Sequence, residues 1–109
     1  MTGETSTEVQ IDITASLEIP VDGTLSKVIY SDDQIRVVGF AFDAGQELTE
    51  HTAGVPVVIQ VVSGRFRFTS DGESYEIGPS SWTHLDASVP HSVYATEPSR
   101  LLLTLLKSS

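Results

Sequence analysis

The chain has 109 residues, no cysteine and a formal net charge of −9. This length fits one globular domain, and the lack of cysteine excludes disulfides, cysteine-based zinc sites, thiol catalysis and iron–sulfur clusters. An acidic chain without a basic stripe is poorly suited to nucleic acid or to an anionic membrane surface, because it offers too few cations to neutralise phosphates.

The first eight residues are acidic and rich in hydroxyl groups, and they lack the apolar segment of a signal peptide. We expect residues 1–8 to form a flexible tail and residues 9–109 to form one domain. No apolar run approaches the roughly 20 residues that span a bilayer. The expectation is a cytoplasmic protein that contacts neither membrane nor nucleic acid.

After the tail, apolar residues recur mostly at every second position, which is typical of β-strands with one buried face. We expect about nine short strands at spacings of roughly 8–12 residues, the rhythm of a sandwich or barrel. The clearest segments are Val9–Ile13, Leu25–Tyr30, Ile35–Phe42, Val55–Val62, Phe66–Phe68, Tyr75–Ile77, His91–Ala95 and Leu101–Leu106.

Turn residues separate these segments, and the Ser70–Glu73 stretch between two alternating runs predicts a tight hairpin. No segment has ten residues at helical period with caps. Leu101–Leu106 is rich in leucine, which favours helices, but six uncapped residues are better interpreted as a strand. The predicted fold class is all-β: a single antiparallel β-barrel or jelly roll.

The three histidines are His51, His84 and His91. Five residues separate Gly45 from His51, and Gly64 follows at the distance that closes a motif. On this spacing the chain resembles the cupin superfamily, and in particular small single-domain bacterial cupins with an RmlC-like jelly roll, also called a double-stranded β-helix. The resemblance covers essentially residues 35–106.

The first motif of that superfamily has a His-x-His pair followed by a glutamate, and the second contributes another histidine. Here His51 and His91 are kept, whereas Ala53 takes the second histidine position and Val57 the glutamate position. In the second motif the glycine, the proline and the second glycine are replaced by Ser80, Asp86 and Ser88.

The resemblance implies a metal site inside the barrel, because strand residues at i and i+2 face the same side. Such a site would hold one divalent transition metal (Zn, Ni, Fe, Mn or Cu) through His51 and His91. The alternative is that the barrel holds no metal. His84 and Gln60 are the candidates to replace the lost ligands. Strict alternation places Gln60 opposite to Val57 unless a bulge turns the strand.

Three functions remain open. The first is a cupin that binds a small molecule at His51 and His91, with or without metal. The second is a metal-free isomerase or epimerase in which a barrel histidine acts as general base, oriented by Asp86 or Glu50. The third is a non-catalytic ligand sensor or structural dimer with an apolar pocket, for which the expected lining residues are Ala53, Val57 and Ile59.

The resemblance also implies a homodimer, and the apolar strands near both ends of the chain favour the same expectation, because their edges would be exposed in a monomer. The expected partners are therefore a small-molecule ligand and a second copy of the chain. Most of the aromatic side chains are expected in the core and at this interface.

Overall fold

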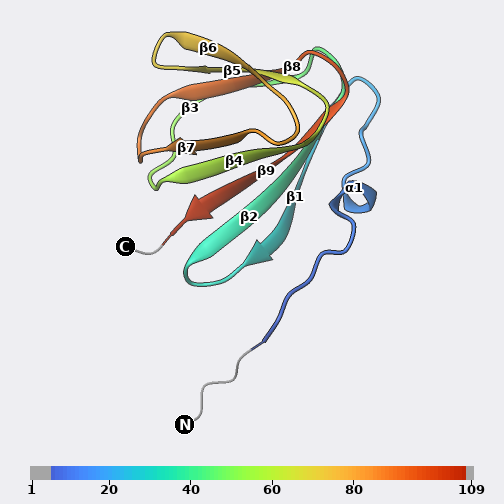
Figure 1. Ribbon diagram of the computed structural model, residues 1–109, viewed down its shortest axis with the longest axis vertical. Coiled ribbons are helices and arrows are strands. Elements are labelled where there is room, and N and C mark those ends of the chain that lie inside the picture. The colour runs from blue at the N-terminus through green and yellow to red at the C-terminus, as the bar shows by residue number, and fades with distance from the viewer. Residues whose placement is uncertain (1–5, 108–109) are drawn as a thin grey trace.

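The computed structural model describes residues 6–107, with the side chain of His51 excepted. Within this range the chain forms nine strands and one four-residue helix (Figure 1). Along the chain these are α1 Ile13–Ser16, β1 Thr24–Ser31, β2 Ile35–Phe42, β3 Glu47–His51, β4 Val57–Ser63, β5 Phe66–Ser70, β6 Glu73–Ile77, β7 Trp82–Leu85, β8 His91–Ala95 and β9 Ser99–Leu106.

The strands form two antiparallel sheets that face each other (Figure 1). We call them sheet A, with strand order β1-β2-β9-β4-β7, and sheet B, with order β3-β8-β5-β6. This confirms the predicted all-β jelly roll. The two sheets are not closed into one continuous barrel, so β7 and β6 are terminal strands of their sheets.

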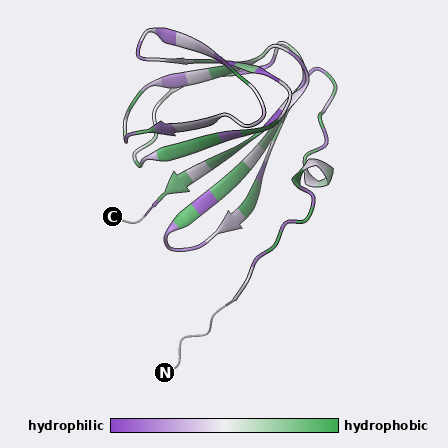
Figure 2. Ribbon diagram, in the orientation of Figure 1, coloured by the Kyte–Doolittle hydropathy of each residue, from purple (hydrophilic) through white to green (hydrophobic). Residues whose placement is uncertain are grey.

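The core lies between the two sheets and consists of every second residue of the inner strands. Val57 and Ile59 from β4 pack with Phe66 and Phe68 from β5, and each of these side chains is at most 3% exposed. Burial of side chains of this size stabilises the fold by roughly 1.5–3 kcal/mol each. Figure 2 shows β2, β4 and β9, the central strands of sheet A, as the most continuously hydrophobic.

Two predicted elements are confirmed in detail. Asp71 and Gly72 both adopt positive φ, 53° and 80°, as a two-residue turn between β5 and β6 requires. The leucine-rich segment near the C-terminus forms β9, which pairs with β2 on one side and β4 on the other. β9 buries Leu101 and Leu103 in the core, whereas Leu102 and Leu106 lie half-buried on the opposite face of the sheet.

The predicted strand at Val9–Ile13 is wrong. Residues 6–10 have no regular secondary structure, and the short helix α1 begins instead after Asp12, whose carboxylate accepts a hydrogen bond from the Ala15 amide. Alternation alone cannot form a strand when no neighbouring strand supplies the hydrogen bonds. Of the predicted tail 1–8, only residues 6–8 lie within the described range, and these are exposed.

The motif glycines are required by their backbone conformation. Gly45 and Gly64 have φ of 85° and 84°, a region that other residues adopt only at a cost. At Gly64 a Cβ atom would also overlap the side chain of Ser99. Among the residues described, no helix has the length and hydropathy needed to cross a membrane.

Candidate functional site

The strand register brings His51 and His91 together. β3 pairs with β8 in sheet B, and a bulge after Leu48 leaves His51 directly opposite His91. The same row continues to Ser70 of β5, which is the partner of His91 on its other side. The side chain of His51 lies outside the described part of the structure, so its role as a metal ligand stays a prediction.

His91 is an interior residue with a fixed ring. It is 2% exposed, its Nδ1 atom lies 3.0 Å from the carbonyl oxygen of Val89, and its ring stacks on Phe68 at a centroid distance of 6.4 Å. A backbone carbonyl at one ring nitrogen orients an imidazole and defines its tautomer. His91, one of the two predicted site histidines, is thus held in a fixed orientation in the core.

The two positions that lost their ligands belong to the hydrophobic core. Val57 is 1% exposed, and Ala53 is half-buried against the same cluster. Ile59, which was also expected to line a pocket, is 1% exposed and lies in that cluster. These three side chains make the interior beside His91 apolar.

Gln60 and His84 lie on the other face of sheet A. Gln60 pairs with Trp82, and His84 pairs with Val58, whereas the inward row pairs Ile59 with Thr83. Gln60 and His84 are both exposed, and the imidazole of His84 stacks on Trp82 at 6.2 Å. The bulge that would turn Gln60 inward does not occur in the β4–β7 pairing, so neither residue lies with His91 in the core.

The two acids considered as partners for a catalytic histidine are surface residues. Glu50 in β3 and Asp86 after β7 are both exposed, and the Asp86 carbonyl accepts a hydrogen bond from the Val89 amide. Within the described residues no three His, Cys, Asp or Glu side chains are grouped as metal ligands. The described side chains therefore do not complete a metal site by themselves.

A cleft of about 530 Å³ lies between β6 and β7, where the two sheets are not joined. Its size is in the range of small-ligand sites. The lining residues come from the β5–β6 hairpin and from the segment that contains β7: Phe68, Ser70, Asp71, Tyr75, Ile77, Ser81, Trp82, Thr83, His84 and Leu85.

The cleft has an apolar floor and an aromatic rim. Phe68, Ile77 and Leu85 are members of the buried core, so the cleft reaches the space between the sheets. Tyr75 and Trp82 are 49% and 63% exposed, and Tyr75 packs against Phe68 at a centroid distance of 6.2 Å. Large aromatic surfaces left exposed beside a cavity are typical of binding sites.

Ser81 adds a polar group to this lining. Its Oγ atom is shielded from solvent and has no hydrogen-bond partner among the residues described. A buried hydroxyl without a partner costs roughly 1–3 kcal/mol. The Oγ atom is closed off from the cleft, so a bound molecule would contact it only after rotation of the Ser81 side chain.

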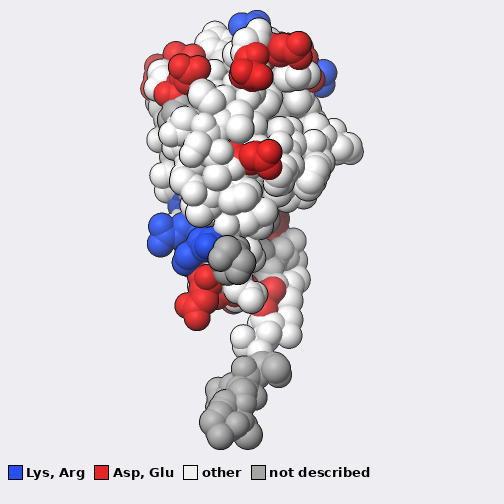
Figure 3. Space-filling model, turned by 90° about the vertical axis from the view of Figure 1, so that its left-hand side faces the viewer, with Lys and Arg blue, Asp and Glu red and all other residues white. Residues whose placement is uncertain are grey.

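The rim of the cleft is electronegative. The Tyr75 hydroxyl donates a 2.8 Å hydrogen bond to Glu73, and this bond, the Glu73 charge and the Asp71 charge raise the pKa of Tyr75 above its ordinary value. Figure 3 shows several acidic side chains at the β5–β6 end of the molecule, with basic side chains among them. Ten residues line the cleft, and none of them is Lys or Arg.

The second motif keeps its backbone although its glycines are lost. Ser80 and Ser88 have φ of 79° and 69°, the left-handed conformation that glycine adopts easily. These serines flank the β7 segment that forms one wall of the cleft. The turn geometry thus persists without the residues that usually provide it.

Sequence reasoning missed this cleft because none of its residues forms a local motif. Trp82 gave one weak signal: it is a large aromatic residue at an outward position of its strand, in register with Gln60, where a purely structural strand would place a polar group. Only the arrangement of the two sheets shows that β6 and β7 face each other as terminal strands.

Solved structures with this architecture include proteins of the cupin superfamily. A conserved protein of unknown function from Streptococcus pyogenes is 25% identical, with a TM-score of 0.84 over 98% of this chain and 94% of that chain. A cupin superfamily protein from Desulfitobacterium hafniense is 16% identical, with a TM-score of 0.85 over 94% of both chains. An RmlC-like cupin protein from Desulfovibrio desulfuricans is 22% identical, with a TM-score of 0.84 over 94% of this chain and 98% of that chain.

No protein-family model and no curated protein matches the sequence. The structural likeness therefore confirms the resemblance at the level of the fold, and the site has to be argued from this chain's own residues.

Proposed function

We propose that this chain, which has the fold of the cupin superfamily, binds a small molecule in the cleft between β6 and β7. The observation that supports the proposal is the 530 Å³ cavity, which combines a core-apolar floor with two exposed aromatic side chains, Tyr75 and Trp82. His91 lies beyond the Phe68 ring that forms part of the cleft floor.

The test uses N-phenyl-1-naphthylamine, a neutral aromatic dye that fluoresces in apolar surroundings. Trp82 is the only tryptophan of the chain, so quenching of protein fluorescence by the dye reports on the cleft itself. We expect saturable binding at one site. The substitution Tyr75→Ala should weaken binding several-fold, because an aromatic contact of this kind contributes about 1 kcal/mol.

The matched control is Tyr30→Ala on β1. Tyr30 and Tyr75 each donate a 2.8 Å hydrogen bond to an acid two residues away, Asp32 and Glu73 respectively, but only Tyr75 lines the cleft. Equal losses in the two variants, or dye fluorescence that never saturates, would contradict the proposal.

A divalent metal at His51 and His91 is a second candidate. The register places the two residues opposite each other, and the Nδ1 atom of His91 faces the Val89 carbonyl. Metal-binding histidines commonly have such an outer partner at the other ring nitrogen. Two histidines fall short of the three or four protein ligands of most sites, so this candidate needs water or a bound ligand to complete the coordination.

Metal analysis of protein purified without a histidine tag tests this candidate. About one equivalent of metal is expected, which His51→Ala and His91→Ala should each abolish. His84→Ala is the control, because His84 lies on the outer face of sheet A and should leave the metal content unchanged. Folded wild-type protein with only background metal would rule the second candidate out.

We also propose that two copies associate through the outer face of sheet A. The outward residues of β2, β4 and β9 are largely aliphatic, and the single charged one among those described, Arg100, donates a hydrogen bond to the Leu17 carbonyl. The half-buried aliphatic side chains on this face are Ile35, Val37, Val58, Leu102 and Leu106.

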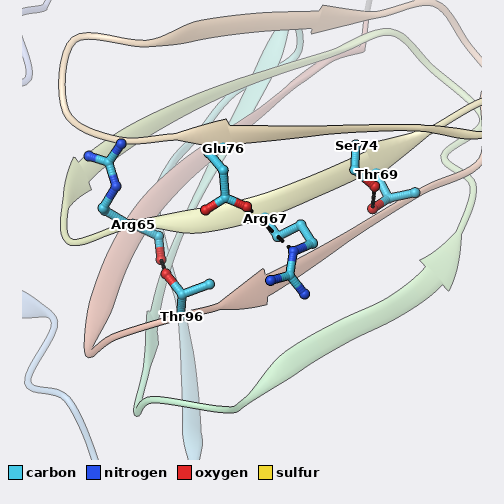
Figure 4. Close-up of polar contacts among 6 residues, drawn as sticks. All are labelled: Arg65, Arg67, Thr69, Ser74, Glu76 and Thr96. Carbon is cyan, nitrogen blue, oxygen red and sulfur yellow. Dashed lines mark hydrogen bonds and ion pairs between the residues drawn. The ribbon is translucent and has the colours of Figure 1, made fainter.

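The outer face of sheet B has the opposite character. There Arg67 forms an ion pair with Glu76 at 3.4 Å, and Thr69 forms a hydrogen bond with Ser74 (Figure 4). In a chain of charge −9, an uncharged face is the place where two copies approach with least repulsion.

The size of this face fits a small dimer interface. Five strands about 4.8 Å apart and about seven residues long give a projected area of roughly 550 Å², and the segment around Leu17 covers the part of it at Gly39. The free area is therefore smaller than the ~800 Å² per partner that standard interfaces bury.

Light scattering on the eluting protein should give the mass of a dimer. Gln60→Glu inserts a charge on the proposed interface at an exposed position that the monomer fold tolerates, and it should shift the protein toward monomer. Thr69→Glu inserts the same charge on the polar face and should leave the dimer intact. A monomeric wild-type protein would contradict the proposal.

A further inference from the structure

We infer that the cleft between β6 and β7 selects small organic cations, of the quaternary ammonium or protonated amine class. This inference rests on the proposed binding function and names the class of ligand. It is carried by the coincidence of three features in one cavity: aromatic faces, carboxylates at the rim, and a lining without Lys or Arg.

The aromatic lining comes from both sides of the cleft. Phe68 and Tyr75 belong to the β5–β6 hairpin, and Trp82 belongs to β7. The face of an aromatic ring carries negative charge density and attracts a cation that approaches within about 6 Å, and Trp is the strongest of these partners. A methylated ammonium group suits such a site because it combines positive charge with an apolar surface.

Two carboxylates set the charge of the rim. Asp71 lines the cleft, and Glu73 accepts the hydrogen bond of the Tyr75 hydroxyl. Glu73 is therefore held at the rim by an aromatic residue that itself lines the cavity. The Tyr75 hydroxyl is a neutral donor, so it does not cancel the negative charge of Glu73. No Lys or Arg lines the cleft to compensate that charge.

The whole chain reinforces this local charge. A net charge of −9 draws cations toward the molecule and repels anions of the same shape. Neither Arg65 nor Arg67 of the β5–β6 region lines the cleft, and Arg67 pairs with Glu76 on the outer face of sheet B. An anionic ligand would find no Lys or Arg among the residues that line the cleft.

Three probes of nearly equal shape test the inference: choline as the cation, 3,3-dimethyl-1-butanol as the neutral analogue and 3,3-dimethylbutyrate as the anion. Titration calorimetry, with Trp82 fluorescence as the local reporter, should show choline binding about tenfold more tightly than the alcohol. The anion should bind least. Raising the salt concentration from about 0.05 to about 0.5 M should weaken choline binding several-fold and leave the alcohol unchanged.

Asp71→Asn should reduce the preference for choline over the alcohol several-fold, without altering the binding of the alcohol. Asparagine tolerates the positive φ of this position, 53°, so the turn should persist. The matched control is Asp33→Asn in the exposed β1–β2 turn, which changes the net charge equally but lies far from the cleft lining.

The outcomes separate the inference from the function on which it rests. Equal affinity for all three probes, or the same loss in Asp71→Asn and Asp33→Asn, would overturn the cation selectivity and leave small-molecule binding in place. Binding of the neutral dye with no detectable binding of choline would do the same. Failure of the dye and of all three probes to bind would remove the proposed function itself.

Discussion

Ser80 and Ser88 each adopt a backbone conformation that costs conformational energy. Both stand where the cupin motif has glycine, and both keep a left-handed backbone, with φ of 79° and 69°. For a residue with a Cβ atom this conformation costs on the order of 1 kcal/mol. The surrounding strands hold the two turns in shape in spite of that cost.

We therefore expect Ser80→Gly and Ser88→Gly each to stabilise the protein by about 0.5–1 kcal/mol, because strain relief outweighs the added freedom of the unfolded chain. Urea unfolding measures the change in the free energy of unfolding. Ser74→Gly, within strand β6, is the control and should destabilise the protein by a similar amount. Destabilisation by all three substitutions would show that the two turns are not strained.

Two carboxyl groups with lowered pKa values, those of Asp32 and Asp43, make the stability of the fold depend on acidic pH. Hydrogen bonds from the Asp22 and Ala44 amides lower the pKa of the Asp43 carboxyl group below its ordinary value of 3.8. The pKa of the Asp32 carboxyl group is lowered in the same way, mainly by hydrogen bonds from the Ile35 and Gln34 amides and to a smaller extent by the bond from the Tyr30 hydroxyl. Both carboxylates are turn residues that cap backbone donors.

A carboxyl group with a lowered pKa in the folded protein contributes stability above pH 3.8, and this contribution disappears as the pH falls from 3.8 toward the lowered value. We expect Asp43→Asn to be less stable than the wild type at pH 7 and nearly equal to it at pH 2. Thermal unfolding at a series of pH values measures the difference. A gap that stays constant down to pH 2 would contradict the role of the charge.

At the scale of elements, Leu17 anchors the end of α1 to the outer face of sheet A. Leu17 is fully buried, and it fills the space above Gly39, where a Cβ atom would lie 2.7 Å from the Leu17 side chain. The Nε atom of Arg100 donates a 2.6 Å hydrogen bond to the Leu17 carbonyl. One apolar and one polar contact thus hold α1 against the outer face of the sheet.

Leu17→Ala should lower the free energy of unfolding by about 2–4 kcal/mol, the usual cost of removing a buried leucine. Hydrogen exchange should show the backbone of residues 12–20 becoming less protected before the strands do. Ile11→Ala is the control, because Ile11 is 90% exposed and should have almost no effect. Equal destabilisation by both variants would mean that Leu17 is not the anchor.

For the whole molecule, the open side of the two sheets has the largest consequences. Sheet A ends at β7 and sheet B ends at β6, and the cleft with Tyr75 and Trp82 lies between these terminal strands. The outer faces differ as well, since sheet A presents aliphatic residues and sheet B presents charged and hydroxyl groups. The proposed ligand site and the proposed dimer face therefore use different parts of sheet A.

Much of the fold was predictable from local pattern. The alternation from Leu25 onward, the Asp71-Gly72 turn and the placement of Gly45 and Gly64 each reflect a short-range constraint of backbone geometry. The failure at Val9–Ile13 has the converse reason. A strand needs a neighbour, and the sequence of one segment does not show whether another strand runs beside it.

The sequence by itself determined that the chain is a β-protein, because the period and the turns are encoded over a few residues, whereas the roles of His51 and His91 stay predictions of the resemblance. Only the tertiary structure decided that His84 and Gln60 face outward, since one residue of strand register moves a side chain to the opposite face. It also decided the site. The cleft joins residues of the β5–β6 hairpin in sheet B with residues of β7 in sheet A, which meet only when the two sheets pack together.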